Sequence, residues 1–340
     1  MKTLEEESLK PKVNPVELVR KIGIPNSVKS ESIRGEEIRG YLNLAKRNKV
    51  PLLFLRSLSE AVYDVKEFIP TYEKWHEKAL ELVSFASELF REEEINYTFF
   101  KTFKPFPFTP SDVDVLLSSK ENLDSAIERL EKEDLRPLDL NTYGSTLYSP
   151  SHDMNVDLTT QRDVSGLVYL NKKYVFKETM EKKVRGSKVR VPKPHANLAI
   201  ASAHALYKEQ MFMLSDFYTF AYLYDEFEKA HKFSRDAKIE PSFLWGIGLT
   251  YRVVERAFGS DNFLANRIRT SFFEESFLED ENLDFVELPT KPSLPRFVAS
   301  LMRKVLDDSL SRKSLPTFLG RAIRPQFASE LVEHISRKRY

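Results

Sequence analysis

Cysteine is absent from the 340-residue sequence, and only ten glycines occur in it. Without cysteine there is no disulfide, no thiolate nucleophile and no cysteine-ligated metal. Long apolar runs are also missing, since no stretch approaches the ~20 residues that a membrane-spanning helix needs. The acidic start, MKTLEEESLKPK, lacks the apolar core of a signal peptide. We therefore expect a cytoplasmic protein that does not associate with membranes.

A net charge of one sign is missing as well, because 52 Lys and Arg balance 51 Asp and Glu. Bulk charge therefore does not predict nucleic-acid binding. The local distribution is uneven. Lys172–Lys193 contains nine basic residues, Glu274–Glu287 contains seven acidic ones, and the chain from Thr290 onward contains eleven basic and four acidic ones. Such runs are either solvated faces or surfaces that bind phosphate or an acidic partner.

Hydrophobic periodicity divides the chain into three regions. Residues 1–70, punctuated by prolines, are predicted to form an arm of short helices. Residues 71–193 begin with a helix that ends near Glu94, after which INYTFFKTF, DVDVLLS and HDMNVDLTT have the pattern of strands. Residues 194–340 are predominantly helical in pattern. We expect an α+β protein, in which a mixed β-sheet flanked by helices is followed by an α-helical domain.

Carboxylates mark the strands of the middle region. Asp112 and Asp114 lie two residues apart, so that on a strand both point to one face with Cα atoms roughly 6.6 Å apart. Such a pair is either solvated, paired with lysines, or a site for a hard cation such as Mg²⁺ or Mn²⁺. Asp157 follows Asp114 by 43 residues, enough for the chain to return as a neighbouring strand, and it is the best candidate for a third ligand. Asp153 is the weaker rival because it lies nearer the start of that strand.

These residues carry a resemblance to a known family. An apolar strand, a turn, about ten residues, then DVDVLL and later VDLTT resembles the nucleotidyltransferase fold of the DNA polymerase β superfamily. VRVPKPHANLAIASAHALYKEQMFMLSDFYTF is similar to the strand-then-helix passage in uncharacterised prokaryotic nucleotidyltransferases. The resemblance covers roughly residues 75–225. It implies that Asp112, Asp114 and Asp157 hold two divalent metals, and that a nucleoside triphosphate, ATP among them, binds beside a closing helical domain.

One feature departs from the family. The family's glycine-serine turn is absent, and Lys101 and Thr102 stand in its place. Thr102 can offer a hydroxyl to a phosphate, and Lys101 or Lys104 can replace backbone amides in binding the anion. Lys208 shares a helical face with His204, and the family resemblance would let it reach a phosphate; a surface salt bridge is the alternative.

The resemblance implies transfer of a nucleoside monophosphate from the triphosphate to an acceptor hydroxyl, with release of pyrophosphate. The acceptor is left open between RNA, protein and a small molecule. The basic Lys172–Lys193 run and the basic C-terminal part suit RNA or DNA, or an acidic protein. The alternative is a catalytically inactive protein of this fold that binds nucleic acid or protein as a regulator. The missing glycine-serine turn supports it, and the retained carboxylates oppose it.

Overall fold

The computed structural model describes residues 13–26, 35–58, 67–164, 166–272 and 288–322. Three short helices come first: α1 (Pro15–Ile22), α2 (Gly35–Arg47) and α3 (Pro51–Leu58). The long helix α4 (Ile69–Glu92) then leads into the sheet. The apolar stripe of α4 is buried from Ala79 to Phe90, as the sequence pattern predicts. The predicted end of this helix near Glu94 is confirmed to within two residues.

A five-stranded sheet forms the centre of the middle region. Its strands are β1 (Tyr97–Phe99), β2 (Asp112–Leu117), β3 (Arg136–Asn141), β4 (Gly144–Ser149) and β5 (Met154–Thr159), in the spatial order β1-β2-β5-β4-β3. Strands β2 and β5 are parallel, whereas the other neighbours are antiparallel. Helix α5 (Lys120–Glu131) connects β2 to β3. The expected mixed α+β class is confirmed.

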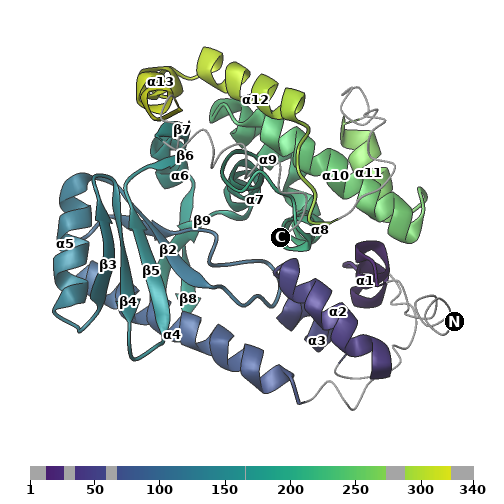
Figure 1. The fold of residues 1–340 in the computed structure, drawn as a ribbon, viewed down its shortest axis with the longest axis horizontal. Coiled ribbons are helices and arrows are strands. Elements are labelled where there is room, and N and C mark those ends of the chain that lie inside the picture. Colours follow the sequence, from purple (N-terminus) through teal and green to yellow (C-terminus); the bar gives the residue numbers. More distant parts are fainter. Residues whose placement is uncertain (1–12, 27–34, 59–66, 165, 273–287, 323–340) are drawn as a thin grey trace, which may run out of the picture.

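Alternation along β2 and β5 gives the sheet two different faces. Val113 and Val115 of β2, with Val156 and Leu158 of β5, pack in one apolar core with α4 and α5. The intervening residues of each strand point away from that core. In Figure 1 the sheet lies on the left, with α5 at its outer edge and α4 beneath it. The carboxylates of β2 and β5 therefore face away from α4 and α5, toward the remaining helices.

Smaller elements link the sheet to the helical half. They are β6 (Arg162–Val164), β7 (Leu167–Leu170), α6 (Lys172–Lys177), β8 (Thr179–Val184) and β9 (Ser187–Pro192). β6 and β7 form one antiparallel hairpin, and β8 and β9 form another. The next elements are α7 (Pro194–Ala203), the π-helix η2 (His204–Lys208), α8 (Leu214–Tyr222), η3 (Tyr224–Glu226), α9 (Phe227–Asp236), α10 (Glu240–Phe258), α11 (Phe263–Phe272), α12 (Leu294–Asp307) and α13 (Ser309–Ala322).

The helices from both ends of the chain share a second apolar core. Leu18 of α1, Phe54 of α3, Phe217 of α8 and Val253 of α10 are all buried in it. Arg20 of α1 donates to the backbone carbonyls of Arg256 and Ala257 at the end of α10. The N-terminal helices are thus packed on the C-terminal ones, and Figure 1 shows α1, α2 and α10 to the right of the sheet.

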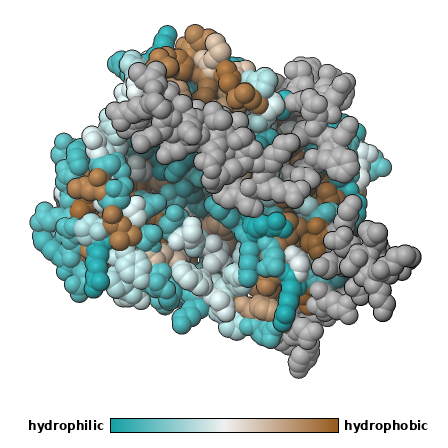
Figure 2. Space-filling view, viewed as in Figure 1, coloured by the Kyte–Doolittle hydropathy of each residue, from teal (hydrophilic) through white to brown (hydrophobic). Residues whose placement is uncertain are grey.

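Helix α12 has an apolar outer face. Its exposed apolar residues recur every four positions and are 43–67% exposed: Leu294, Val298, Met302 and Leu306. Figure 2 shows apolar atoms gathered over this part of the molecule, at the top of the view. Phe297, Ser300 and Lys304 on the same helix are buried. Among the described residues, no helix is both long and apolar enough to cross a bilayer.

Candidate functional site

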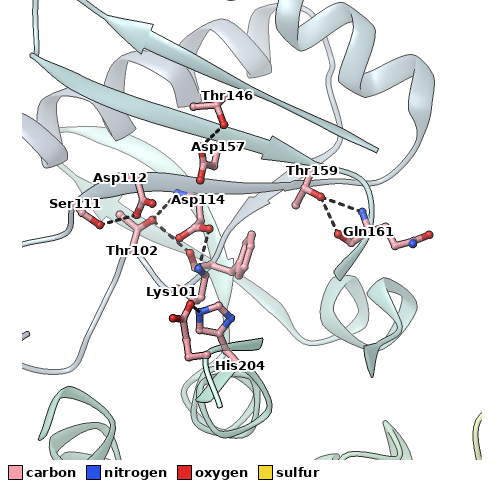
Figure 3. Close-up of polar contacts among 12 residues, drawn as sticks. Lys101, Thr102, Ser111, Asp112, Asp114, Thr146, Asp157, Thr159, Gln161 and His204 are labelled. Atoms are coloured by element: carbon pink, nitrogen blue, oxygen red, sulfur yellow. Dashed lines mark hydrogen bonds and ion pairs between the residues drawn. The ribbon is translucent and has the colours of Figure 1, made fainter. Parts of the chain in front are cut away.

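The pairing of β2 with β5 brings the predicted carboxylates together. Asp114 lies opposite Asp157 and Asp112 lies opposite Asn155 in the parallel register. Adjacent strands are ~4.8 Å apart, so Asp114 and Asp157 are direct neighbours across the sheet. Figure 3 shows the three carboxylates on the same side of the two strands. Asp114 is buried, whereas Asp112 and Asp157 are partly exposed.

Asp157 is oriented by the next strand. Thr146 of β4 lies opposite it in register, and the Thr146 hydroxyl donates to Asp157 Oδ1 at 2.8 Å (Figure 3). Asp153 instead occupies the turn before β5, where it accepts from the Tyr148 hydroxyl and pairs with Lys78 at 3.7 Å. The structure thus places Asp157, and not Asp153, beside Asp114.

Lys101 adopts the backbone conformation that glycine favours. Its φ is +61°, in the left-handed region that costs energy for a residue with a Cβ. Its Nζ lies 2.9 Å from Asp114 Oδ1 (Figure 3). Lys101 therefore adopts the conformation that the tight turn requires and places its ammonium on Asp114, the central carboxylate.

Thr102 fixes this turn onto β2. Its Oγ1 accepts from the Asp114 backbone N–H at 3.1 Å and donates to the Phe100 carbonyl at 3.3 Å. The side chain is buried. The hydroxyl thus holds the turn against the strand that carries Asp112 and Asp114.

Lys104 is buried between the turn and the helical half. Its Nζ lies 3.8 Å from Asp216 of α8 and donates to Thr219 Oγ1 at 3.2 Å. Burial lowers the pKa of Lys104, and the carboxylate of Asp216 partly opposes that shift. Burial likewise raises the pKa of Asp216, against the opposing charge of Lys104.

A cavity of about 490 Å³ opens on the Asp112 side of the carboxylates. Its cationic lining residues are Lys46, Lys49, Lys101 and Lys104, and its aromatic ones are Tyr72, Trp75 and Phe108. Trp75 is 37% exposed and lies beyond the part of α4 that is buried against the sheet. Lysines together with exposed aromatic rings are suited to a phosphorylated molecule that carries a planar ring.

A second cavity, of about 430 Å³, opens on the Asp157 side. Asp114 lines both cavities. The second is bordered by Thr146, Asp157, Arg162 of β6 and Lys208, together with the turn between β3 and β4. Lys208 is exposed and is the last residue of η2. Asp112, Asp114 and Asp157, called the carboxylate row below, therefore form the boundary between two cavities that each contain cationic side chains.

The π-helix η2 presents residues to both cavities. His204 at its start lines the first cavity and Lys208 at its end lines the second. His204 Nε2 lies 2.9 Å from Glu209, and its Nδ1 lies 3.4 Å from the Tyr169 hydroxyl. Burial holds the pKa of His204 well below its ordinary value, while its hydrogen bond lowers the pKa of Glu209 to about 2. Isolated π turns are frequent at functional sites.

The carboxylate row fits a hard divalent cation by its chemistry. All three side chains offer oxygen ligands, which Mg²⁺ and Mn²⁺ prefer. Burial and the nearby charge of Asp114 raise the pKa of Asp112, as expected where negative charge is incompletely compensated. Within the described ranges, no three His, Asp or Glu side chains already converge as a metal site. Lys101 is the cation that lies on Asp114, with its Nζ 2.9 Å from Asp114 Oδ1.

Three of the nine basic residues in the Lys172–Lys193 run form ion pairs within the described part of the protein. Lys188 pairs with Glu181, Lys193 with Glu178, and Arg185 with Glu77 and Glu81 of α4. The acidic Glu274–Glu287 run and the last part of the basic C-terminal region lie outside the described residues. The described pairs reduce the net positive field that the sequence suggests at this run.

Several residues of the site were not predicted from the sequence. Lys46 lies in the last turn of the amphipathic helix α2 and Lys49 lies just beyond it, so both have the local pattern of surface lysines. Tyr72 and Trp75 continue the apolar stripe of α4, so the pattern predicts that they are buried. Arg162 is the one with a usable signal, because it follows VDLTT by only two residues. A basic residue that close to a carboxylate strand end is a reasonable site candidate.

Comparison of the chain with protein-family models, with curated proteins and with solved structures gives no match.

Proposed function

We propose that this chain is a metal-dependent nucleotidyltransferase with the polymerase-β-like nucleotidyltransferase fold. The observation that carries the proposal is the parallel register that sets Asp114 beside Asp157, with Asp112 on the same face. The adjoining cavity supplies lysines for phosphates and aromatic rings for a base. The family resemblance implies three acidic residues that hold two divalent metals, with two of them on one strand and the third on a neighbouring strand.

Each residue has a role in the proposed reaction. Asp112, Asp114 and Asp157 would hold Mg²⁺ or Mn²⁺, which supplies positive charge that stabilises the transferring phosphoryl group. Lys104 and Lys101 would bind the triphosphate, with Lys101 leaving Asp114 for a phosphate oxygen. Thr102 would keep the turn in place. The acceptor hydroxyl oxygen bonds to the α-phosphorus, the α–β phosphoanhydride bond breaks, pyrophosphate leaves, and the hydroxyl proton passes to Asp157.

Calorimetric titration of ribo- and deoxyribonucleoside triphosphates, with and without Mg²⁺ or Mn²⁺, tests the proposal. The wild type is compared with the double substitution Asp112→Asn and Asp114→Asn. We expect saturable binding that requires the metal and that falls at least ~100-fold in the double variant, since two ligands lose their charge. Asp124→Asn, which changes an exposed α5 carboxylate paired with Lys120, is the matched control. A folded wild type that binds no triphosphate contradicts the proposal.

A second function is favoured by the Lys101–Asp114 ion pair. A lysine that permanently neutralises the central carboxylate would leave a nucleotide-binding protein without catalysis, acting as a regulator. Such a protein would bind triphosphates equally well with and without divalent metal. The same titration separates the two, and release of labelled pyrophosphate with candidate RNA, DNA or protein acceptors supports only the enzyme.

A further inference from the structure

The cavity on the Asp157 side contains a buried cation without a full set of partners. Arg162 is only 7% exposed, and its guanidinium lies over the Phe100 ring at 4.3 Å from the centroid. Its Nη2 has no hydrogen-bond partner among the described residues. Because a buried guanidinium N–H normally has an acceptor, an unpaired one is costly to stability. The missing acceptor is therefore a feature of the site that needs an explanation.

Nearby carboxylates are engaged elsewhere. Asp163 Oδ2 accepts from Gln161 Nε2 at 3.2 Å, and its Oδ1 accepts from the backbone N–H of Gly166 at 2.9 Å. Asp114 pairs with Lys101, and Asp157 accepts from Thr146. The described carboxylates near Arg162 are thus oriented by other donors.

Lys208 adds a second positive charge to the same cavity. Desolvation is the largest cause that lowers the pKa of Lys208, and the nearby positive charges of Arg162 and Lys101 lower it further. The cavity lining also includes Asp114, Asp157 and Asp163, but each of these carboxylates already accepts from another donor. Arg162 and Lys208 repel each other across the cavity, and an anion between them removes that repulsion. Arginine is especially suited to phosphate, because its planar N–H groups match two phosphate oxygens.

We propose that this cavity binds a phosphate group carried by the acceptor, through Arg162 and Lys208. The acceptor then approaches Asp157 from one side of the carboxylate row, while the nucleoside triphosphate occupies the lysine-rich cavity on the other side. The acceptor assignment rests on the proposed function, whereas the phosphate site does not. Asp114, which borders both cavities, lies between the two ligands.

Direct titration tests the phosphate site without nucleotide or metal. Inorganic phosphate and ribose 5-phosphate are titrated into the wild type, Arg162→Gln and Lys208→Gln. We expect saturable binding in the wild type, weakened about tenfold or more by either change, since hydrogen bonds between charged groups are stronger than those between neutral ones. Exposed Lys208 keeps the test valid if Arg162→Gln does not fold. Lys188→Gln, on the exposed β9 surface, is the matched control.

A competition arm tests which ligand the cavity takes. Ribose 5-phosphate is titrated into protein saturated with a non-hydrolysable α,β-methylene triphosphate and Mg²⁺. Simultaneous binding of both supports the acceptor site. Mutual exclusion overturns it, because the cavity would then hold the triphosphate itself. Absence of phosphate binding, or binding that ignores both substitutions, also overturns the inference. Failure of triphosphate binding alone removes the proposed enzyme but leaves the phosphate site in place.

Discussion

At the scale of single residues, the site depends on Lys101 combining two functions. Its backbone has the positive φ that the turn requires, and its ammonium neutralises Asp114. Glycine would provide the first feature without strain, and only a cation provides the second. A lysine in the left-handed conformation is therefore explained by its ammonium group, which neutralises Asp114.

The His204–Glu209 pair predicts a dependence of stability on pH. The folded pKa of His204 lies well below 6.5, and that of Glu209 lies at about 2 against a usual 4.5. As pH falls through 6.5, the unfolded chain therefore binds a proton at His204 that the folded chain does not bind. As pH falls through 4.5 toward 2, the same holds for Glu209. The free energy of unfolding should decrease over both windows. Lys101, Arg162 and Lys49 face this pair and oppose protonation further.

Urea unfolding between pH 7.5 and 3.5 measures this effect. Glu209→Gln should lose the part of the decrease that begins below pH 4.5, because glutamine does not titrate. Glu181→Gln, which changes an exposed carboxylate on β8, should keep the wild-type slope. Equal slopes in the two variants would contradict the assignment.

At the scale of elements, β4 and β5 are packed so closely that Gly144 has no room for a side chain. A Cβ at this position would lie 2.5 Å from the Leu158 carbonyl oxygen, which is backbone and cannot rotate away. Gly144→Ala should therefore cost about 1–3 kcal/mol of unfolding free energy by overpacking. It should also displace β5 and with it Asp157, so that triphosphate affinity falls as well.

Thermal unfolding and calorimetry together check this prediction. Gly320→Ala on α13 is the control, since a Cβ there meets nothing within 4 Å and alanine favours a helix. A Gly144→Ala variant as stable as this control would show that the two strands can separate at little cost.

The sequence predicts which side chains are buried where burial follows from the alternation along a single strand. Period-two alternation correctly predicted that Met154, Val156 and Leu158 are buried while Asn155 and Asp157 are not. It could not place Arg162, whose burial depends on the β6–β7 hairpin and on helices far along the chain. The sequence also does not predict the π-helix at His204–Lys208, because His204 and Lys208 would share one face of an ordinary α-helix as well.

At the scale of the whole molecule, the Lys104–Asp216 pair connects the turn of the sheet region to the helical half. Loss of one partner leaves an uncompensated buried charge, which costs about 3–5 kcal/mol. We expect Lys104→Met and Asp216→Asn to be strongly destabilising one at a time. The double variant should recover much of that loss, because no charge is then left unpaired.

A double-mutant cycle in urea measures this coupling. The two tryptophans report separately, since Trp75 lies on α4 and Trp245 lies on α10. The single variants should show unfolding transitions at the two probes that no longer coincide. Additive effects of the two substitutions would mean that the pair does not couple the halves.

Helix α13 reaches back to the β6–β7 hairpin. Ser311 donates to the Val168 carbonyl at 2.6 Å, and the Val168 N–H donates to Ser314 at 3.0 Å, across sequence separations of 143 and 146 residues. During synthesis the N-terminal part of a chain emerges and folds first. The hydrogen bonds between Val168 of the β6–β7 hairpin and α13 can therefore form only after α13 has been synthesised. Strands β2 and β5 can pair much earlier. A nascent chain would acquire its carboxylate row well before its second cavity, so that ribosome-bound intermediates should not bind phosphate there.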